Sequence, residues 1–232
     1  MRRLPTALLL LLCLPIVSCA QDTDAKANLD FCGLRYKNTK VLKKYLAAEL
    51  AFLNIQDGDT IVDIGASSGA FAGALSVLNT KKNIHFVLVD IDTACLNQRA
   101  VNNMLRYFET FKNAPLNIST SIINNTEDSL HLPHAAAKKM WIINTLHEIP
   151  DKLAIARQVV NALDQNGELV VAELLATAEQ KIHKGCKKML LSEEEIKNIF
   201  VNAGLQFKES ANIQIAKQKD KEPYCFFRFI KE

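Results

Sequence analysis

The sequence predicts an α/β fold: one doubly wound, mostly parallel seven-stranded sheet with helices on both of its faces. Short, wholly apolar segments alternate with amphipathic segments of helical length, a pattern typical of parallel strands buried on both faces. The last two predicted strands, 207–215 and 225–230, are joined only by the charged segment 217–222. This connection is too short for a parallel crossover, so these two strands are predicted to form an antiparallel C-terminal hairpin.

The first half of the domain is predicted to alternate helix and strand. Apolar residues recur at helical spacing between positions 39 and 54 and predict a helix there, followed by a turn at 56–59. The patterns that follow predict, in order, a strand at 60–64, a helix at 70–78, a strand at 84–89 and a helix at 93–111.

The second half continues the alternation, with strands at 116–123 and 140–143. Pro150 is expected in the first turn of a helix that runs to Leu163. The segment 164–167 is a predicted turn into a strand at 168–173. Ser192 and Glu195 predict a capping box at the start of a helix that Gly204 ends, and the C-terminal hairpin follows.

Composition fits one domain and gives no reason to expect a nucleic-acid partner. The 232 residues are 49% hydrophobic, which is enough for a full core. The net charge is +3, and Arg2 and Arg3 supply two of the 28 basic residues, which leaves 26 against 25 acidic ones. The remaining chain is therefore nearly neutral, and it has no basic run with interleaved aromatic residues.

Residues 1–18 are predicted to be a signal peptide. Arg2 and Arg3 precede an apolar stretch, 8–17, that is too short to span a bilayer. The segment 16–19 resembles the bacterial lipobox, so Cys19 is the expected lipidation site, and acyl chains on it would anchor an exported chain in the cell-envelope membrane. An ordinary cleaved signal and a cytoplasmic protein are the alternatives. Residues 19–38 would then be a tether and lead-in, and 39–232 the folded domain.

The segment 60–71 combines an apolar strand, a turn with two glycines and a helix of small residues. Gly65 and Gly69 stand where a Cβ would block the approach of the backbone to a ligand. Asp90 ends the next predicted strand, where a carboxylate can accept hydrogen bonds from ribose hydroxyls. Together these features predict a site for a nucleoside-containing cofactor.

Four ordered motifs resemble those of the class I S-adenosylmethionine-dependent methyltransferases. They are the glycine segment 63–69, the acids Asp90 and Asp92, the segment 144–148 and the strand segment 167–173. The resemblance extends over roughly residues 38–232. It implies seven strands with the last one antiparallel, in agreement with the predicted hairpin, and S-adenosylmethionine as the cofactor.

The resemblance also implies roles for residues of the glycine loop. Asp63, Gly65 and Gly69 would lie under the methionine portion of the cofactor. Ser67 occupies a position where the family often has a second glycine, and serine is small enough to permit a close approach.

Further positions follow from the same resemblance. Asp90 would bind the ribose hydroxyls, with Asp92 as a weaker candidate. Asn125 and Asp128 belong to a segment that would lie beside the adenine, although many family members have Asp where this chain has Asn125. Asn144 would line the site next to the reacting sulfur.

The implied activity is in-line methyl transfer to a small-molecule acceptor. The cofactor carries the activated group, so a base is needed only for a protonated acceptor. His147 is the first candidate for this base, His183 a weak candidate and Glu173 a distant third, and a pocket-lining role for the histidines stays open. The alternative is a non-catalytic envelope lipoprotein that keeps the fold as a ligand-binding module.

Four cysteines follow the leader, and the sequence does not choose among their three possible pairings. Cys95 and Cys225 lie in apolar stretches typical of buried thiols, whereas Cys186 is expected in a pocket wall or a disulfide. His183, Cys186 and Cys32 offer too few ligands for a soft metal, so no metal is expected.

The predicted export is difficult to reconcile with the predicted cofactor, because S-adenosylmethionine is a cytosolic metabolite that an exported protein would meet only in small amounts. Three interpretations remain: an anchored envelope methyltransferase, an envelope binding protein, and a cytosolic enzyme whose apolar N-terminus is misread. The oligomeric state is not indicated by the sequence.

Overall fold

The computed structural model describes residues 29–213 and 223–232. The predicted signal peptide, the lipidation site Cys19 and the hairpin turn 217–222 lie outside these residues. No helix within the described ranges is both long enough and apolar enough to cross a membrane.

A seven-stranded sheet forms the centre of the fold, with strand order β3-β2-β1-β4-β5-β7-β6. Strands β1 to β5 pair with one another in parallel, and β7 is antiparallel to both β5 and β6. The predicted fold class and its antiparallel C-terminal hairpin are confirmed. The strands are β1 (Thr60–Ile64), β2 (Ile84–Asp90), β3 (Ile118–Asn124), β4 (Ala137–Ile143), β5 (Leu163–Leu174), β6 (Gln206–Asn212) and β7 (Tyr224–Ile230).

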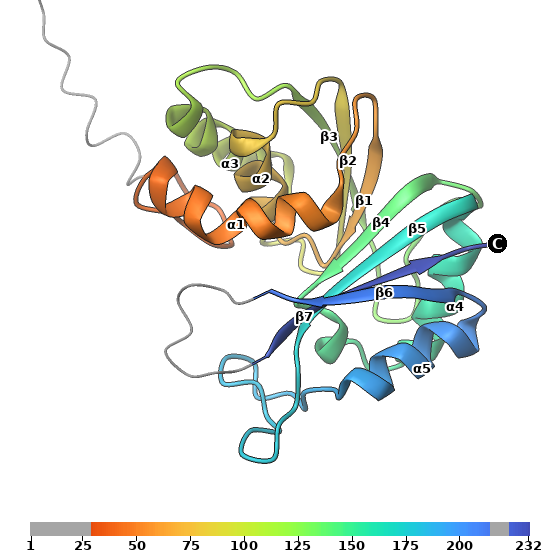
Figure 1. The fold of residues 1–232 in the computed structure, drawn as a ribbon. Coiled ribbons are helices and arrows are strands. Elements are labelled where there is room, and N and C mark those ends of the chain that lie inside the picture. The colour runs from red at the N-terminus through yellow and green to blue at the C-terminus, as the bar shows by residue number, and fades with distance from the viewer. Residues whose placement is uncertain (1–28, 214–222) are drawn as a thin grey trace, which may run out of the picture.

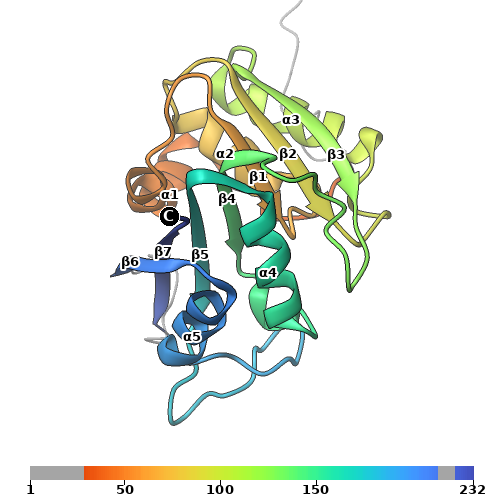
Figure 2. The ribbon, with the colours of Figure 1, turned by 90° about the vertical axis from the view of Figure 1, so that its right-hand side faces the viewer.

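Two helical layers cover the sheet, one on each face (Figures 1 and 2). Three helices pack together on one face: α1 (Thr39–Leu53), α2 (Ala70–Leu78) and α3 (Gln98–Lys112). Two helices pack on the other: α4 (Lys152–Ala162) and α5 (Glu193–Ala203). A short 3-10 helix, η1 (Leu146–Glu148), follows β4.

Each face of the sheet has its own apolar core, because the parallel strands are buried on both sides. On the face of α1 to α3 the core is centred on large aromatic side chains, including Phe86, Phe108 and Trp141. On the face of α4 and α5 it contains Phe200 and Phe227. The sheet is therefore held rigidly from both sides, so the loops at its edges start from fixed positions.

Most predicted elements are present, and the differences have local causes. The helix expected at 93–111 begins only at Gln98, because Asn97 caps it and residues 93–95 form a turn closed by the Asp92 carboxylate. The helix expected from Pro150 begins at Lys152, with Asp151 as its cap. The capping box of Ser192 and Glu195 is confirmed.

The turn predicted at 164–167 is instead an irregular part of β5. Leu163 pairs with Ala137, but the next paired residue of β5 is Glu168, opposite Lys139. The residues between them bulge out of the ladder, with Asn166 at a φ of 59°. The turn-forming composition is thus accommodated inside a strand, because Leu163 already pairs with β4 where α4 ends.

Candidate functional site

A pocket of about 850 Å³ opens at the carboxyl edge of the sheet, within the size range of small-molecule sites. It lies where β1, β2 and β4 end, at the point where the strand order reverses, which is where open α/β sheets bind ligands. Its lining includes seven of the nine predicted cofactor residues: Asp63, Gly65, Ser67, Asp90, Asp92, Asn125 and Asn144.

Gly65 is required by the turn that follows β1. Its φ is +78°, and a Cβ there would lie 2.2 Å from Cγ2 of Thr145, in the loop after β4. The Gly65 and Ala66 amides both donate to the carbonyl of Val89 in β2, at 2.8 and 3.1 Å. The loop is thus pressed against two neighbouring strands, and only glycine fits at its first position.

Asp90 fixes the rest of the glycine loop. Its Oδ2 accepts a hydrogen bond of 2.7 Å from the Ser67 amide, and its Oδ1 accepts one of 2.9 Å from the Asp92 amide. Each carboxylate oxygen keeps a further lone pair for a ligand. Ser67 itself has a φ of 52°, a left-handed conformation that explains the glycine common at this position in the family it resembles.

Two predicted cofactor residues lie outside the pocket lining, and one lines it in a structural role. Gly69 begins α2, where a Cβ would lie 2.8 Å from Leu88, so it allows the helix to pack closely on β2. Asp128 is exposed, and its carboxylate accepts a bond from the Thr126 hydroxyl. Asp92 lines the pocket but uses its carboxylate to cap the turn before α3.

The pocket contains hydrogen-bond acceptors that have no partner. Among the described residues, five buried side-chain polar atoms lack a hydrogen-bond partner, and three of these belong to pocket residues. They are Oε2 of Glu49, Oδ1 of Asn125 and Oδ1 of Asn144, and all three accept hydrogen bonds. A buried polar atom without a partner is costly, so these atoms indicate a ligand that brings donors.

Three acids of the pocket also have no cationic partner in the described part of the chain. No lysine or arginine of the described ranges forms an ion pair with Glu49, Asp63 or Asp90. Burial, with a smaller contribution from Asp90, raises the pKa of Asp63 to about 7. Burial likewise raises the pKa of Glu49. Such carboxyls favour a cation that would restore their charged form.

Sequence reasoning did not single out Glu49, which lies at one end of the pocket with Tyr36, Tyr45 and Tyr224. Burial and then Glu49 raise the pKa of Tyr36 to about 12, so the two groups lie close together. A signal was present: Glu49 falls on the buried stripe of α1 that also holds Leu42, Leu46 and Leu53. A carboxyl on an apolar helix stripe marks either a buried ion pair or a site.

The described residues that line the pocket do not include the predicted bases His147 and His183. His147 is buried in η1, and its Nδ1 lies 2.8 Å from Oε2 of Glu173, the third predicted base. His183 lies on the connection after β5, with its ring centroid 4.7 Å from that of His147. The geometry therefore gives no support to these residues as bases in the pocket.

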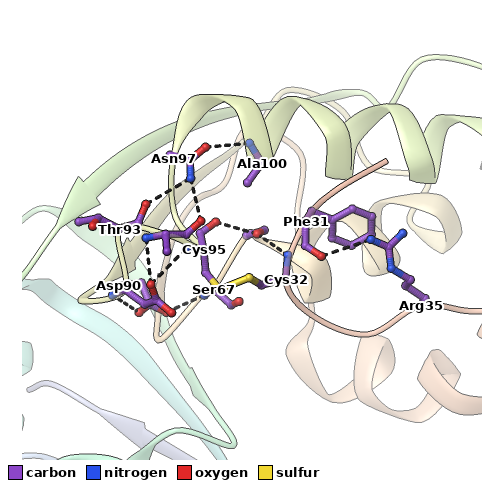
Figure 3. Close-up of a disulfide and its surroundings, with 12 residues drawn as sticks. Phe31, Cys32, Arg35, Ser67, Asp90, Thr93, Cys95, Asn97 and Ala100 are labelled. Carbon is purple, nitrogen blue, oxygen red and sulfur yellow. Dashed lines mark hydrogen bonds between the residues drawn. A yellow bond between two sulfur atoms is a disulfide. The ribbon is translucent and has the colours of Figure 1, made fainter. Parts of the chain in front are cut away.

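A disulfide joins Cys32 to Cys95 at the rim of the pocket (Figure 3). The Cys32 amide donates to the Ser68 hydroxyl, which in turn donates to the carbonyl of Cys95. The lead-in segment is thereby attached to the glycine loop and to the turn after β2. Of the alternatives that the sequence left open, the structure pairs Cys95 in a disulfide rather than leaving it a buried thiol. Cys225 is free and buried, and Cys186 is free.

No protein family model matches the sequence, and no curated protein shows significant sequence similarity to it. The fold has many solved counterparts. A S-adenosylmethionine-dependent methyltransferase from Methanosarcina mazei is 14% identical, with a TM-score of 0.61 over 78% of this chain and 96% of its own. One from Aquifex aeolicus is 15% identical, with a TM-score of 0.57 over 85% of this chain and 100% of its own.

Another solved structure with this fold is the [4+2]-cyclase SpnF, 14% identical, with a TM-score of 0.62 over 81% of this chain and 80% of its own. The same architecture thus carries more than one chemistry, so function must be argued from the site. The comparisons establish that this chain has the fold of S-adenosylmethionine-dependent methyltransferases.

Proposed function

We propose that this protein binds S-adenosylmethionine and is a methyltransferase acting on a small-molecule acceptor. The observation that carries the proposal is the pocket of uncompensated acids and unpartnered acceptors at the carboxyl edge of the sheet. The cofactor is a sulfonium with an ammonium, two ribose hydroxyls and an adenine amine. It therefore brings positive charge and hydrogen-bond donors to these acids and acceptors.

Each part of the cofactor can be assigned to particular residues of the pocket lining. The Asp90 carboxylate, at the end of β2, has free lone pairs for ribose hydroxyls. Asn125 follows β3 and would accept from the adenine amine, since its Oδ1 is buried without a partner. Asp63 and the loop from Gly65 to Ser67 remain for the charged methionine portion, and Asn144 for the neighbourhood of the sulfur.

The end of the pocket around Glu49 is left for the acceptor. When bound, the cofactor supplies an activated methyl group, so the protein mainly has to align the acceptor with it. Glu49 has a raised pKa and an unpartnered Oε2, and can accept the proton of a hydroxyl or amine that faces it. The three tyrosines beside it form an aromatic wall suited to a small acceptor.

Calorimetry with S-adenosylmethionine and S-adenosylhomocysteine tests the cofactor assignment. Wild type should bind both. Asp90→Ala should abolish binding, whereas Asp128→Ala, a nearby exposed acid outside the pocket, should not change it. Asn125→Ala and Asn144→Ala should each weaken binding about tenfold, because each removes one hydrogen bond. Failure of the folded wild type to bind either compound would overturn the proposal.

Turnover tests the acceptor end. S-adenosylhomocysteine release is measured with pools of small hydroxyl, thiol and amine compounds. Glu49→Gln should lower the rate at saturating cofactor and leave cofactor affinity unchanged. Binding without turnover across all pools would favour a ligand-binding module over an enzyme.

We further propose that the protein is exported and anchored through Cys19. The leader supports this, and so does the Cys32–Cys95 disulfide, because disulfides persist in oxidising compartments and are rare in the cytosol. Mass spectrometry of the native chain is the test. An acylated Cys19 at the N-terminus supports the proposal, whereas a retained Met1 with reduced Cys32 and Cys95 contradicts it.

A further inference from the structure

Outside the pocket, three ligand-type side chains converge from distant parts of the sequence. His147 lies in η1, and His183 and Cys186 lie in the connection between β5 and α5. One donor atom from each lies within 4.8 Å of the other two. Sequence reasoning considered only His183 and Cys186, with Cys32, and found too few ligands. Cys32 is in a disulfide, but the fold supplies His147 in its place.

The His147 ring is oriented by its carboxylate partner. Its Nδ1 lies 2.8 Å from Oε2 of Glu173, so this nitrogen carries the proton and donates it. The lone pair is then on Nε2, which is buried and has no hydrogen-bond partner among the described residues. Carboxylate–histidine pairs of this kind are typical behind metal-bound imidazoles, because the carboxylate fixes the tautomer and raises the basicity of the ligand nitrogen.

His183 and Cys186 are presented together by a small antiparallel loop. Ile182 pairs with Met189, the His183 amide donates to Lys188, and the Lys187 amide donates back to the His183 carbonyl. This loop places Nδ1 of His183 3.1 Å from Sγ of Cys186. Two ligands separated by two residues is the spacing common in zinc-binding loops.

The separations suit one small metal ion. A tetrahedral Zn²⁺ with bonds of about 2.0 Å to nitrogen and 2.3 Å to sulfur places its ligand atoms roughly 3.4 to 3.6 Å apart. The cluster spans 3.1 to 4.8 Å, so small side-chain rotations suffice. Oε1 of Glu148 lies 3.6 Å from Nε2 of His147, which puts a carboxylate within reach of a fourth position.

We propose that His147, His183 and Cys186 bind a zinc ion, with Glu173 orienting His147. Imidazole and thiolate together favour Zn²⁺ over Mg²⁺ or Ca²⁺, which prefer oxygen ligands. The ion would join η1, at the end of β4, to the loop 181–190. Because Asn144 and Thr145 precede η1 directly and line the pocket, the ion would also stabilise the wall of the pocket.

The test uses the full chain with its disulfide intact, freed of metal by a chelator. Zn²⁺ binding is measured by competition with a chromophoric chelator, and Co²⁺ is used as a spectroscopic probe. Wild type should bind one equivalent of Zn²⁺, and its Co²⁺ form should show a thiolate-to-metal charge-transfer band. Zn²⁺ should also raise its Tm, because the ion binds only the folded state.

Variants assign the ligands. Cys186→Ser should abolish the charge-transfer band and weaken Zn²⁺ binding by more than about 100-fold, and Glu173→Gln should weaken it about 10- to 100-fold. His183→Ala should also weaken it and remove the Tm shift. His134→Ala, an exposed histidine, and Cys225→Ala, a free cysteine outside the cluster, should match wild type.

Two results would overturn the proposal: no charge-transfer band in wild type, or a band and affinity that survive in Cys186→Ser. Because Cys186 and His183 are only partly buried, their variants are expected to fold, which circular dichroism checks. The measurement needs neither S-adenosylmethionine nor an acceptor, so its outcome is independent of the proposed methyltransferase activity.

Discussion

Acidic residues have different partners at the two edges of the parallel sheet: the amino edge, where the strands begin, and the carboxyl edge, where they end. At the amino edge, Lys139 lies 2.7 Å from Asp59 and 3.6 Å from Glu168, and Arg228 also pairs with Glu168. At the carboxyl edge, Asp63 and Asp90 have no such cation within the described part of the chain. At the amino edge the acids are thus neutralised by cations of the protein itself, whereas Asp63 and Asp90 are not.

The disulfide is the largest stabilising difference that we expect between the two edges. It closes a segment of 63 residues at the carboxyl edge, and the loss of this constraint should cost about 4 kcal/mol of unfolding free energy. The double variant Cys32→Ser/Cys95→Ser is compared with wild type by urea unfolding. Reductant should lower the stability of wild type to that of the variant and leave the variant unchanged; an effect of reductant on the variant would contradict this.

The pH dependence of the free energy of unfolding tests whether the pKa of Asp63 is raised in the folded state. The folded state raises the pKa of Asp63 from 3.8 to about 7, so between these values the folded chain keeps a proton that the unfolded chain has lost. The free energy of unfolding therefore falls as pH rises through this window and levels off above it.

Asp63→Asn removes this dependence. The variant should be nearly as stable as wild type at pH 4, and more stable by up to about 4 kcal/mol at pH 8, at about 1.4 kcal/mol per pKa unit. Urea unfolding at several pH values, without ligand, measures the difference. A difference that does not change with pH would show that Asp63 titrates normally.

A pair of glycines offers a matched comparison of the two edges. Gly58 at the amino edge and Gly65 at the carboxyl edge share a φ of +78°, but only Gly65 has a neighbour in the path of a Cβ. Gly58→Ala should cost about 1 kcal/mol through backbone strain alone, whereas Gly65→Ala should cost about 3 kcal/mol because it also displaces Thr145. Equal losses of stability for the two variants in thermal unfolding would mean that Thr145 moves away from the added Cβ at little cost.

Lys139→Met removes a cation from the amino edge, so that an acid there has no partner, as at the carboxyl edge. It leaves Asp59 without its cation in a largely buried position and should cost about 2 kcal/mol, the opposite sign to Asp63→Asn at pH 8. Adding Asp59→Asn should recover part of the loss. A second substitution that deepens the loss would show that the pair is not the cause.

The sequence was sufficient where the signal is local. A strand, two glycines and an acid at the next strand end identify Gly65 and Asp90, because each role depends on backbone conformation close in the chain. The antiparallel C-terminal hairpin followed from the short connection between its two strands, whereas the order of the strands in the sheet was not predicted. Gly69 was interpreted as a ligand contact, but helix–strand packing gives the same requirement for a small residue.

What the sequence left open depends on contacts between distant segments. The pairing of Cys32 with Cys95 and the meeting of His147 with His183 require the folded sheet, since no spacing rule relates these positions. Glu49 was overlooked because an isolated acid in a helix is usually solvated, and only its place on the buried stripe of α1 distinguishes it. The bulge at 164–167 shows the reverse case, in which strand pairing overrides local turn composition.

The position of β7 between β5 and β6 determines when the chain can fold during synthesis. β5 obtains its second neighbour only from residues 224–230, so at least 230 residues must leave the ribosome before the sheet is complete. Until then β5 presents an open, apolar strand edge that can pair with other chains. The nascent chain thus keeps this strand edge unpaired until its synthesis is almost finished.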